Sequence, residues 1–452
     1  MLAIIALLMI CTFVYFLLSQ KLTVVGSLLI IPLVFGVGIA LFTNSGLEAV
    51  FKWIYEGIFY SIDEVSGEIV SGVAPAVFLI LFAIFYFNMM LDVGLFDPII
   101  EFFIKEMRGD PLRVTILTVC SSIAVSSTGD TTTAVIILLA AFVDLYKQME
   151  MRLPILALLI IGPNTILNML PWGGPAAVIS SALNIELMDL SFALFPGMAG
   201  GILYTICLAF YFGYKERQRL NFDKEAELDE GQKEKMLASI RNRRVEYKRP
   251  HLYWINLLLT LTIIGLLMLG YGHGSVLFLL GSIIGATINF GDSKIVMDRI
   301  REYVAGAIAP PMATLGAGAF SGILYGSGMS QALAFGVVKA IPRFLGQHMA
   351  LVYTLITIPG LVFLPQEAYY FGISSVMVNV MEQFGVTPLQ TGVASMIPQA
   401  FGMISPIIPA LYILTAQTQQ TFFEYQKRYI KYLWPIFAIF CIIYILTGSL
   451  PV

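Results

Sequence analysis

The stretch SSTGDTTT at residues 126–133 interrupts an apolar region that extends from 111 to 148. The stretch PQEAYYFG at 365–372 interrupts a second apolar region, 346–384, in the same way. Each region is long enough for two short helices and has polar, helix-breaking residues at its centre. Inside a bilayer, such a break is tolerated only where protein or a water-filled cavity satisfies the exposed backbone. The two stretches therefore predict a pair of re-entrant hairpins.

The composition places the chain in a membrane. Of its 452 residues, 58% are hydrophobic and 12% are charged, and the mean hydropathy is +0.84. Soluble domains carry about 25% charged and about 45–50% apolar residues. The four cysteines lie in apolar stretches without metal-ligand or disulfide spacing, and we interpret them as small core residues. The composition thus excludes a soluble domain and predicts a polytopic membrane protein.

Further apolar segments could each cross a bilayer, which needs roughly 17–25 residues. They lie at 2–18, 22–42, 70–93, 153–172 and 192–213, and then at 252–270, 274–290, 304–326, 388–414 and 432–449. The first segment lacks a basic start and a cleavage site, so it is interpreted as a span and not as a signal peptide. A charged linker, 214–250, separates the two series.

The two halves have the same order of segments, including an amphipathic stretch after the second span of each. We predict a first repeat at 1–213, with its hairpin at 111–148 and a broken span at 153–185, and a second repeat at 251–452, with its hairpin at 346–384 and a broken span at 388–414. Five crossings per half would insert the halves from opposite sides. The predicted fold is therefore all-α, with two inverted repeats of five spans plus a re-entrant hairpin each, as in many secondary transporters.

The distribution of basic residues predicts the orientation. With the amino terminus outside, all of the 26 Lys and Arg residues except Lys52, Lys339 and Arg343 fall inside. Basic residues concentrate on the cytoplasmic side of membrane proteins. We expect an inner or plasma membrane location, with both termini on the extracellular or periplasmic side and the linker 214–250 in the cytoplasm.

Asp130 and Glu367 lie at the breaks of the two predicted hairpins. An ionised carboxylate at the centre of a bilayer costs at least about 2.5–3.5 kcal/mol, so it is rarely present without a function. Asp130 precedes Thr131 and Thr132 at a predicted helix start, where N–H groups attract anions. The tip could hold a substrate carboxylate, and Asp130 a proton, Na⁺ or a metal. The alternative is that both acids serve only the helix ends.

The predicted broken spans read GPNTILNMLPWGGPAAV at 162–178 and MIPQAFGMISPIIPALY at 396–412. Each span contains three prolines and at least one glycine, which must unwind the helix. Paired unwound spans are typical of transporter binding sites. The polar residues nearest the breaks are Asn164, Asn168, Gln399 and Ser405. They are interpreted either as ligand-binding groups or as hydrogen-bonding contacts between helices.

Several motifs resemble one family. LPWGGP at 170–175, AGAFSGILYGSGM at 317–329, EAYYFG at 367–372 and ISPIIPALYIL near the end of the run 305–415 are similar to the citrate–metal/proton symporter family of the ion transporter superfamily. The order of segments resembles that family over nearly the whole chain. The chain departs from the family pattern after GGP, where Ala176, Ala177 and Val178 stand in place of Thr and a nearby Arg.

This resemblance implies an elevator-type transporter, in which both hairpins and both broken spans slide against a scaffold. It implies uptake of citrate as a complex with Mg²⁺ or Ca²⁺, together with H⁺ or Na⁺, and no permanently bound cofactor. The implied substrate-binding residues are Thr131, Thr132, Asn168, Trp172, Gly173, Gly174, Tyr370, Gln399 and Ser405, and the implied coupling or metal residues are Asp130, Glu367 and Asn164. The expected partners are a small organic anion and the lipid bilayer, without nucleic acid, and a homodimer is one open oligomeric state.

Other functions stay open at this point. The same fold could carry another small carboxylate, an amino acid, or Na⁺ and H⁺ alone. Paired re-entrant hairpins also occur in channels. Gly129–Asp130 is similar to part of an intramembrane aspartyl protease site, but the chain shows no second core aspartate to pair with it. Because no nucleotide loop, nucleophile motif or metal-ligand cluster is present in the sequence, we predict a protein that is not an enzyme.

The predicted orientation can be tested by labelling. Single cysteines introduced into the linker 214–250 should not react with an impermeant thiol reagent added outside intact cells, because the linker is predicted to be cytoplasmic. A cysteine in place of Lys52, which is predicted to lie outside, serves as the positive control. Labelling of the linker from outside would overturn the repeat assignment.

Overall fold

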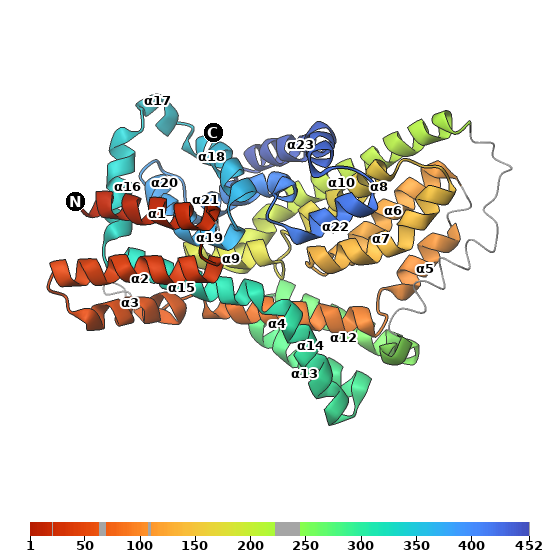
Figure 1. Cartoon of the computed structure of the whole chain (residues 1–452), viewed down its shortest axis with the longest axis horizontal. Helices are drawn as coiled ribbons and strands as arrows, with labels where there is room; N and C mark the ends of the chain where they lie inside the picture. Colours follow the sequence, from red (N-terminus) through yellow and green to blue (C-terminus); the bar gives the residue numbers. More distant parts are fainter. Residues whose placement is uncertain (20, 63–68, 107–109, 222–244, 452) are drawn as a thin grey trace.

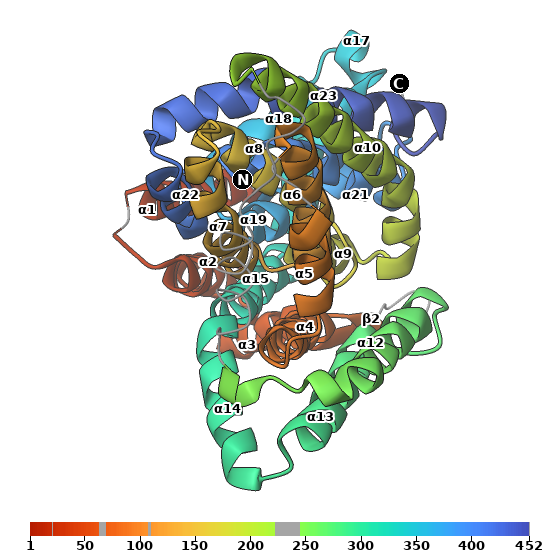
Figure 2. The ribbon, with the colours of Figure 1, turned by 90° about the vertical axis from the view of Figure 1, so that its right-hand side faces the viewer.

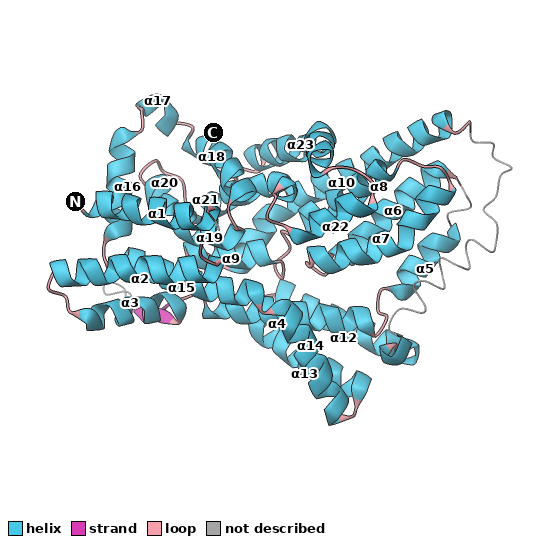
Figure 3. Ribbon diagram, in the orientation of Figure 1, coloured by secondary structure: helices cyan, strands magenta, loops and turns pink. Residues whose placement is uncertain are grey.

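The computed structural model describes residues 1–19, 21–62, 69–106, 110–221 and 245–451 (Figure 1). Most of the predicted linker, 222–244, lies outside these described residues. Almost all regular structure in the described part of the chain is helical (Figure 3). The predicted helical class is therefore observed.

The described residues of the first half form ten helices and one pair of strands. They are α1 (Leu2–Leu18), α2 (Val24–Phe42), α3 (Leu47–Ile58), β1 (Tyr60–Ile62), β2 (Ile69–Ser71), α4 (Ala74–Asp92), α5 (Asp97–Glu106), α6 (Pro111–Ser126), α7 (Thr131–Gln148), α8 (Leu153–Leu167), α9 (Gly174–Leu183) and α10 (Leu187–Arg219).

The second half follows with a similar order of elements. They are the short 3₁₀ helices η1 (Val245–Tyr247) and η2 (Pro250–Leu252), α12 (Tyr253–Met268), α13 (Gly274–Phe290), α14 (Ser293–Ala307), α15 (Ala309–Gly326), α16 (Met329–Ala340), α17 (Arg343–Gly346), α18 (Met349–Phe363), α19 (Gln366–Tyr369), the π-helix η3 (Tyr370–Ser374), α20 (Ser375–Glu382), α21 (Pro388–Met396), the 3₁₀ helix η4 (Ile397–Ile404), α22 (Pro409–Gln417) and α23 (Phe422–Leu446).

Six helices in the described residues are long and apolar enough to cross a membrane, and two bent helix pairs raise this number to eight. The bent pairs are α14 with α15 and the α21–η4 segment with α22. The chain is therefore a multi-pass membrane protein.

Among the boundaries that differ from the sequence-based expectation, two concern α4 and α10. Strand β2, which pairs antiparallel with β1, occupies the start of the predicted span 70–93, so α4 begins only at Ala74. Gly72 permits this turn, because a Cβ at that position would lie 2.6 Å from the carbonyl carbon of Ile58. The second difference is that α10 continues to Arg219, inside the predicted linker, because its charged last turns still bond within the helix.

The helices form layers that mix the two halves. Helix α4 packs against α13, and α15 packs against α2 and α3. Helices α12, α13 and α14 lie on one side of the molecule, opposite α10, α18 and α23 (Figure 2). A buried hydrogen bond of 2.7 Å between the hydroxyls of Tyr86 in α4 and Thr260 in α12 also joins the halves. Neither half can therefore bury its apolar surface without the other.

Helix α23 completes the hydrogen bonding of the broken span η4. The hydroxyl of Tyr425 donates to the carbonyl oxygen of Met403 at 2.8 Å, and that of Tyr429 donates to Ala400 at 2.6 Å. Gln426 makes a third bond of this kind. An unpaired carbonyl in apolar surroundings costs several kcal/mol, so side-chain donors replace the bonds that the break removes.

An ion-pair cluster joins the end of α10 to the starts of α6 and α8. The carboxylate of Glu216 is fully buried and accepts bonds from the backbone N–H of Arg152 at 3.1 Å and from its guanidinium at 2.6 Å. Arg219 donates to the same carboxylate at 2.8 Å. Next to this cluster, Arg217 bonds to Asp110, the N-cap residue of α6, at 2.6 Å. These bonds hold the three helix ends together.

This cluster predicts that substitutions of two acidic residues, Glu216 and Asp144, change the stability of the protein to different extents. Glu216→Gln should lower the free energy of unfolding by about 2 kcal/mol, because it leaves Arg152 and Arg219 without their buried carboxylate. Asp144→Asn is the matched control, since the Asp144 side chain is 81% exposed and its ion pair with Lys147 spans 4.0 Å. The control should change stability by less than about 0.5 kcal/mol. Denaturant unfolding in detergent measures both, and equal effects would contradict a structural role for the cluster.

Candidate binding site

Both halves of the chain contribute to one cavity of about 350 Å³. Its walls come from the loop between α6 and α7, the break between α8 and α9, the segment between α18 and α19, and the break between η4 and α22. The predicted residues that line it are Asp130, Thr131, Thr132, Asn168, Trp172, Gly174, Glu367, Gln399 and Ser405. The structure thus brings together side chains that are far apart in sequence.

Asp130 caps the start of α7. One carboxylate oxygen accepts the backbone N–H groups of Thr132 at 3.0 Å and Thr133 at 3.4 Å, and the other oxygen accepts the hydroxyl of Thr133. The Thr133 hydroxyl also lies 3.4 Å from the amide oxygen of Asn88 in α4. The N–H groups of Thr132 and Thr133, which the sequence suggested for a substrate carboxylate, are therefore occupied by Asp130. The negative charge of this carboxylate is placed at the cavity.

The loop between α6 and α7 is held from behind by the first broken span. The Thr131 hydroxyl donates to the Asn164 amide oxygen at 2.9 Å, and the Asn164 amide nitrogen donates to Ser126 at 3.2 Å. The indole N–H of Trp172 donates to the carbonyl oxygen of Ser127 at 2.7 Å. These bonds place the loop against LPWGGP and satisfy polar groups that the two breaks expose.

Two glycines allow this close approach. Gly129 has a φ of +79°, a left-handed conformation that L side chains rarely adopt. Gly173 lies against the preceding turn, where a Cβ would be 2.2 Å from the carbonyl oxygen of Asn168. Gly173 itself does not line the cavity but fixes the backbone between Trp172 and Gly174.

The second half places another acid in the same cavity. Glu367 lies in the first turn of α19, and the amide nitrogen of Gln366 is 3.4 Å from one of its carboxylate oxygens. That nitrogen also lies next to Gly174, where a Cβ would be 3.3 Å away. Gln366 therefore joins the second hairpin region to the first broken span.

Gln399 is supported by a buried polar group behind the cavity. Its amide nitrogen donates to the hydroxyl of Tyr370 at 2.8 Å, and this hydroxyl lies 3.3 Å from the carbonyl oxygen of Ser395. Tyr370 is fully buried and does not line the cavity. It fixes the orientation of Gln399, whose side chain is 4% exposed. On the same wall, Ser405 accepts the N–H of Ile407 at 3.3 Å.

The electrostatics of the cavity are one-sided. Among its described lining residues, Asp130 and Glu367 are the ionisable side chains, and the other polar groups are neutral hydroxyls and amides. No group of three or more His, Cys, Asp or Glu side chains that could hold a metal ion occurs in the described residues. The site can therefore offer carboxylate, hydroxyl and amide oxygens to a cation, but it offers an anion no positively charged side chain.

A family model described as "Citrate transporter" matches residues 1–416. The chain belongs to the citrate transporter family. The "Citrate transporter" of Bacillus subtilis (strain 168) is 31% identical over 432 residues, which cover 96% of this chain and 95% of the relative. The "Mg(2+)/citrate complex secondary transporter" of the same organism is 30% identical, with full coverage of both chains.

Solved structures show the same fold at low sequence identity. The YdaH transporter of Alcanivorax borkumensis has a TM-score of 0.59 and 12% identity, and covers 93% of this chain and 99% of its own. MtrF of Neisseria gonorrhoeae has a TM-score of 0.55 and 13% identity, with 92% and 94% covered. The family and its relatives are transporters, so the prediction that the chain is not an enzyme is confirmed.

Several residues that line the cavity were not predicted from the sequence. Ile80 and Ile84 of α4 and Pro310 of α15 form part of the wall, because helices outside the broken segments pack across them. Gln366 and Met403 also line the cavity. Only Gln366 carried a usable signal, since it is a polar residue next to Glu367 in an apolar region.

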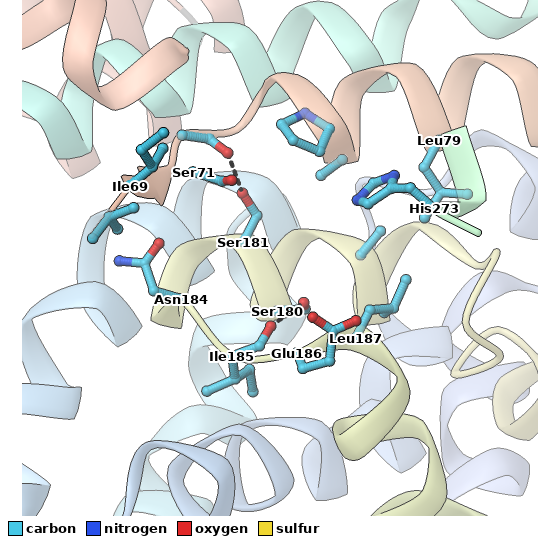
Figure 4. Close-up of a pocket in the computed structure, with 15 residues that line it drawn as sticks. Ile69, Ser71, Leu79, Ser180, Ser181, Asn184, Ile185, Glu186, Leu187 and His273 are labelled. Carbon is cyan, nitrogen blue, oxygen red and sulfur yellow. Dashed lines mark hydrogen bonds between the residues drawn. The ribbon is translucent and has the colours of Figure 1, made fainter. Parts of the chain in front are cut away.

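A second cavity, of about 410 Å³, lies at the opposite end of α9 (Figure 4). Ser180, Ser181 and Asn184 near the end of α9 line it, together with Glu186 and His273. Since α9 begins at Gly174 in the first cavity, its ten residues connect the two, over about 15 Å at 1.5 Å per residue. Asp130 and Glu367 do not line this second cavity.

The packing at LPWGGP gives a prediction for transport. Gly173→Leu should reduce substrate uptake more than tenfold without loss of protein from the membrane, because its side chain would overlap the Asn168 carbonyl and displace the cavity wall. Trp172→Phe keeps an aromatic ring, although a smaller one, and loses the bond to Ser127. It should reduce uptake about fivefold, which corresponds to about 1 kcal/mol. Gly265→Leu is the control, since nothing lies within 4 Å of a Cβ there. Uptake of radiolabelled substrate into cells measures the three variants, and wild-type uptake by Gly173→Leu would make LPWGGP a packing kink.

Proposed function

We propose that the chain is a secondary transporter that carries citrate, as a complex with a divalent cation, in symport with protons or another cation. The observation that carries this proposal is the charge of the cavity. Two carboxylates face a site that has no cationic side chain among its described lining residues.

Free citrate is a poor ligand for such a site. Two like unit charges about 6 Å apart repel each other by about 3 kcal/mol at an effective dielectric constant of about 20. Trianionic citrate would meet this repulsion from Asp130, and from Glu367 whenever its carboxyl group is ionised. A divalent cation bound to citrate removes most of its charge, and both Mg²⁺ and Ca²⁺ accept carboxylate ligands from a protein as well as from a substrate. The metal is then cargo, and the two carboxylates bind the complex at its positive side.

The comparisons and the cavity size support this substrate class. One relative is named for citrate and another for its complex with Mg²⁺. The cavity volume of about 350 Å³ lies at the small end of ligand sites, which range from about 300 to 1,000 Å³. The remaining polar groups, Thr132, Asn168 and Gln399 among them, can bond to the hydroxyl and carboxylate oxygens of the substrate.

The packing of the helices supports two inverted repeats. Helix α4 of the first half packs on α13 of the second, and the corresponding pair, α15 and α2, packs in the same way. Likewise, α15 packs on α3 while α4 packs on α14. Exchanged contacts of this kind are expected of two repeats related by a pseudo-two-fold axis. With this arrangement, the 1–213 and 251–452 repeats would insert from opposite sides.

The transport path would use both cavities. In an elevator mechanism, the helices around Asp130 and Glu367 would slide as a body, and the second cavity at the end of α9 would become the opening on the other side. The amino terminus and the end of α10 lie at opposite ends of the long axis of the molecule (Figure 1). This placement supports an extracellular or periplasmic amino terminus and a cytoplasmic linker.

Proteoliposomes test the substrate and the coupling directly. We expect concentrative citrate uptake that requires Mg²⁺ or Ca²⁺ and a gradient of H⁺ or Na⁺. Chelation of divalent cations should lower uptake at least tenfold, because repulsion of free citrate by one ionised carboxylate in the cavity already costs more than the roughly 1.4 kcal/mol of a tenfold effect. Uptake of citrate that is equal with and without divalent cations would reject the complex as substrate. Preferred uptake of a different carboxylate would reject citrate.

The two acids should share the coupling. Asp130→Asn and Glu367→Gln keep the side-chain size but remove the charge, so both should lose concentrative uptake, and at least one should keep substrate exchange. Asp144→Asn and Glu382→Gln are controls on the same segments, because both side chains are exposed. Accumulation in proteoliposomes against a pH or Na⁺ gradient is the measurement. If the double variant still accumulates substrate in response to the gradient, the acids are structural.

A further inference from the structure

A small basic cavity lies away from the binding site, between α8, α10 and α23. Its volume is about 190 Å³, and its cationic side chains are Arg152, Lys215 and Arg428. The rest of its lining is apolar or aromatic and consists of Pro154, Ile155, Leu158, Phe212 and Tyr432. No acidic side chain is part of this lining among the described residues.

The positive charge of this cavity is only partly compensated. Arg152 and Arg219 share the single carboxylate of Glu216. Lys215 bonds to the Tyr211 hydroxyl and lies 4.4 Å from the centre of that ring, and no ion pair of Lys215 with an acid occurs in the described part of the chain. This leaves hydrogen-bond donors of Arg152 and Lys215 for a ligand.

Arg428 adds a third cation from the other wall. It donates to the side-chain oxygen of Gln420 at 2.7 Å, which uses one of its five N–H groups. The nearest acid on its own helix is Glu424. Its carboxylate accepts the backbone N–H of Thr421 at 2.9 Å and so caps the start of α23. Three cations on three helices thus face one space, an arrangement that suits the oxygens of a phosphate group.

The position of the cavity along the helices is that of a membrane interface. Leu153 begins the apolar part of α8 directly after Arg152, and the apolar part of α10 ends just before Lys215. Exposed apolar side chains continue along the neighbouring faces, with Phe210 49% exposed on α10 and Trp434 49% exposed on α23. Lipid phosphates lie at this level, and lipid chains would lie beside these side chains.

We propose that this cavity binds the phosphate of an anionic phospholipid, whose glycerol and acyl chains lie on Phe212, Tyr432 and the exposed apolar faces of α10 and α23. The apolar lining favours a lipid over a free anion. Basic pockets between membrane helices on the cytoplasmic side are suited to anionic head groups. The lipid would join α8, which carries part of the binding site, to α10 and α23.

Lipid titration of the full chain in uncharged detergent tests the proposal. Dioleoylphosphatidylglycerol should raise the thermal unfolding midpoint in a saturable manner and appear as a bound lipid in native mass spectrometry, whereas dioleoylphosphatidylcholine should do neither. In the double variant Lys215→Gln/Arg428→Gln, the apparent dissociation constant for the anionic lipid should rise about 25-fold, since each cation near an anionic lipid contributes about fivefold.

A charge-matched control distinguishes a site from general attraction. Lys147→Gln/Lys294→Gln removes two exposed cations that are predicted to lie on the same membrane side but do not line the cavity. It should keep wild-type affinity, and equal weakening in both double variants would overturn the proposal. If Lys215→Gln/Arg428→Gln fails to fold, Lys215→Arg should keep lipid affinity while Lys215→Gln loses it, and equal affinity of these two would also overturn it.

Free anions provide the last test. Inorganic phosphate and citrate, each at millimolar concentration, should shift the unfolding midpoint of the wild type and of the cavity variants by the same amount. A larger shift in the wild type, together with displacement of the bound lipid, would mean that the cavity takes a free anion, which would reject a lipid as its ligand.

Discussion

The need to satisfy backbone groups where helices break inside an apolar environment governs this structure. Pro171, Gly173 and Pro398 lie in segments where regular α-helical bonding stops or changes. Side chains from other elements provide hydrogen-bond donors for the exposed carbonyl groups. Trp172 bonds to the Ser127 carbonyl, and Tyr425 and its neighbours on α23 bond to the carbonyls of η4. In the α6–α7 loop and in η4, donors from other segments therefore satisfy carbonyl groups that the breaks expose.

The same constraint builds the cavity. Segments whose backbones must be satisfied by one another have to lie side by side, and this brings Asp130 and Glu367 to one space. The acids stand at helix starts, where capping fixes the carboxylate of Asp130 by three bonds. Since the neutral groups around them are held by Asn164 and Tyr370, the cavity is preorganised around negative charge. The proposed preference for a metal-neutralised anion would follow from the packing of the breaks.

The sequence was informative where a residue type has a strong local consequence. Proline and glycine in LPWGGP, and Asp130 before three threonines, indicated the breaks and the cap. It was less informative where tertiary packing decides. The resemblance of EAYYFG to the family implied that Tyr370 binds the substrate, and in the structure the hydroxyl of Tyr370, in the π-helix η3, bonds to Gln399. Nothing in the sequence indicated that Ile80 forms part of the cavity wall, because an isoleucine in a membrane span is equally suited to contact with lipid or with a cavity.

The bond between Tyr86 and Thr260 has a consequence for biosynthesis. These residues are 174 positions apart in the chain, so α4 enters the membrane long before its partner α12 exists. At about 5–20 residues per second, the ribosome needs roughly 10 to 35 s to supply the partner. During this interval the phenol of Tyr86 has no Thr260 to bond with, and the face of α4 that later covers α13 is open to lipid or to other nascent helices. The first half must therefore remain in the bilayer without its packing partners during this interval, and the insertion machinery or a membrane chaperone can shield its exposed faces.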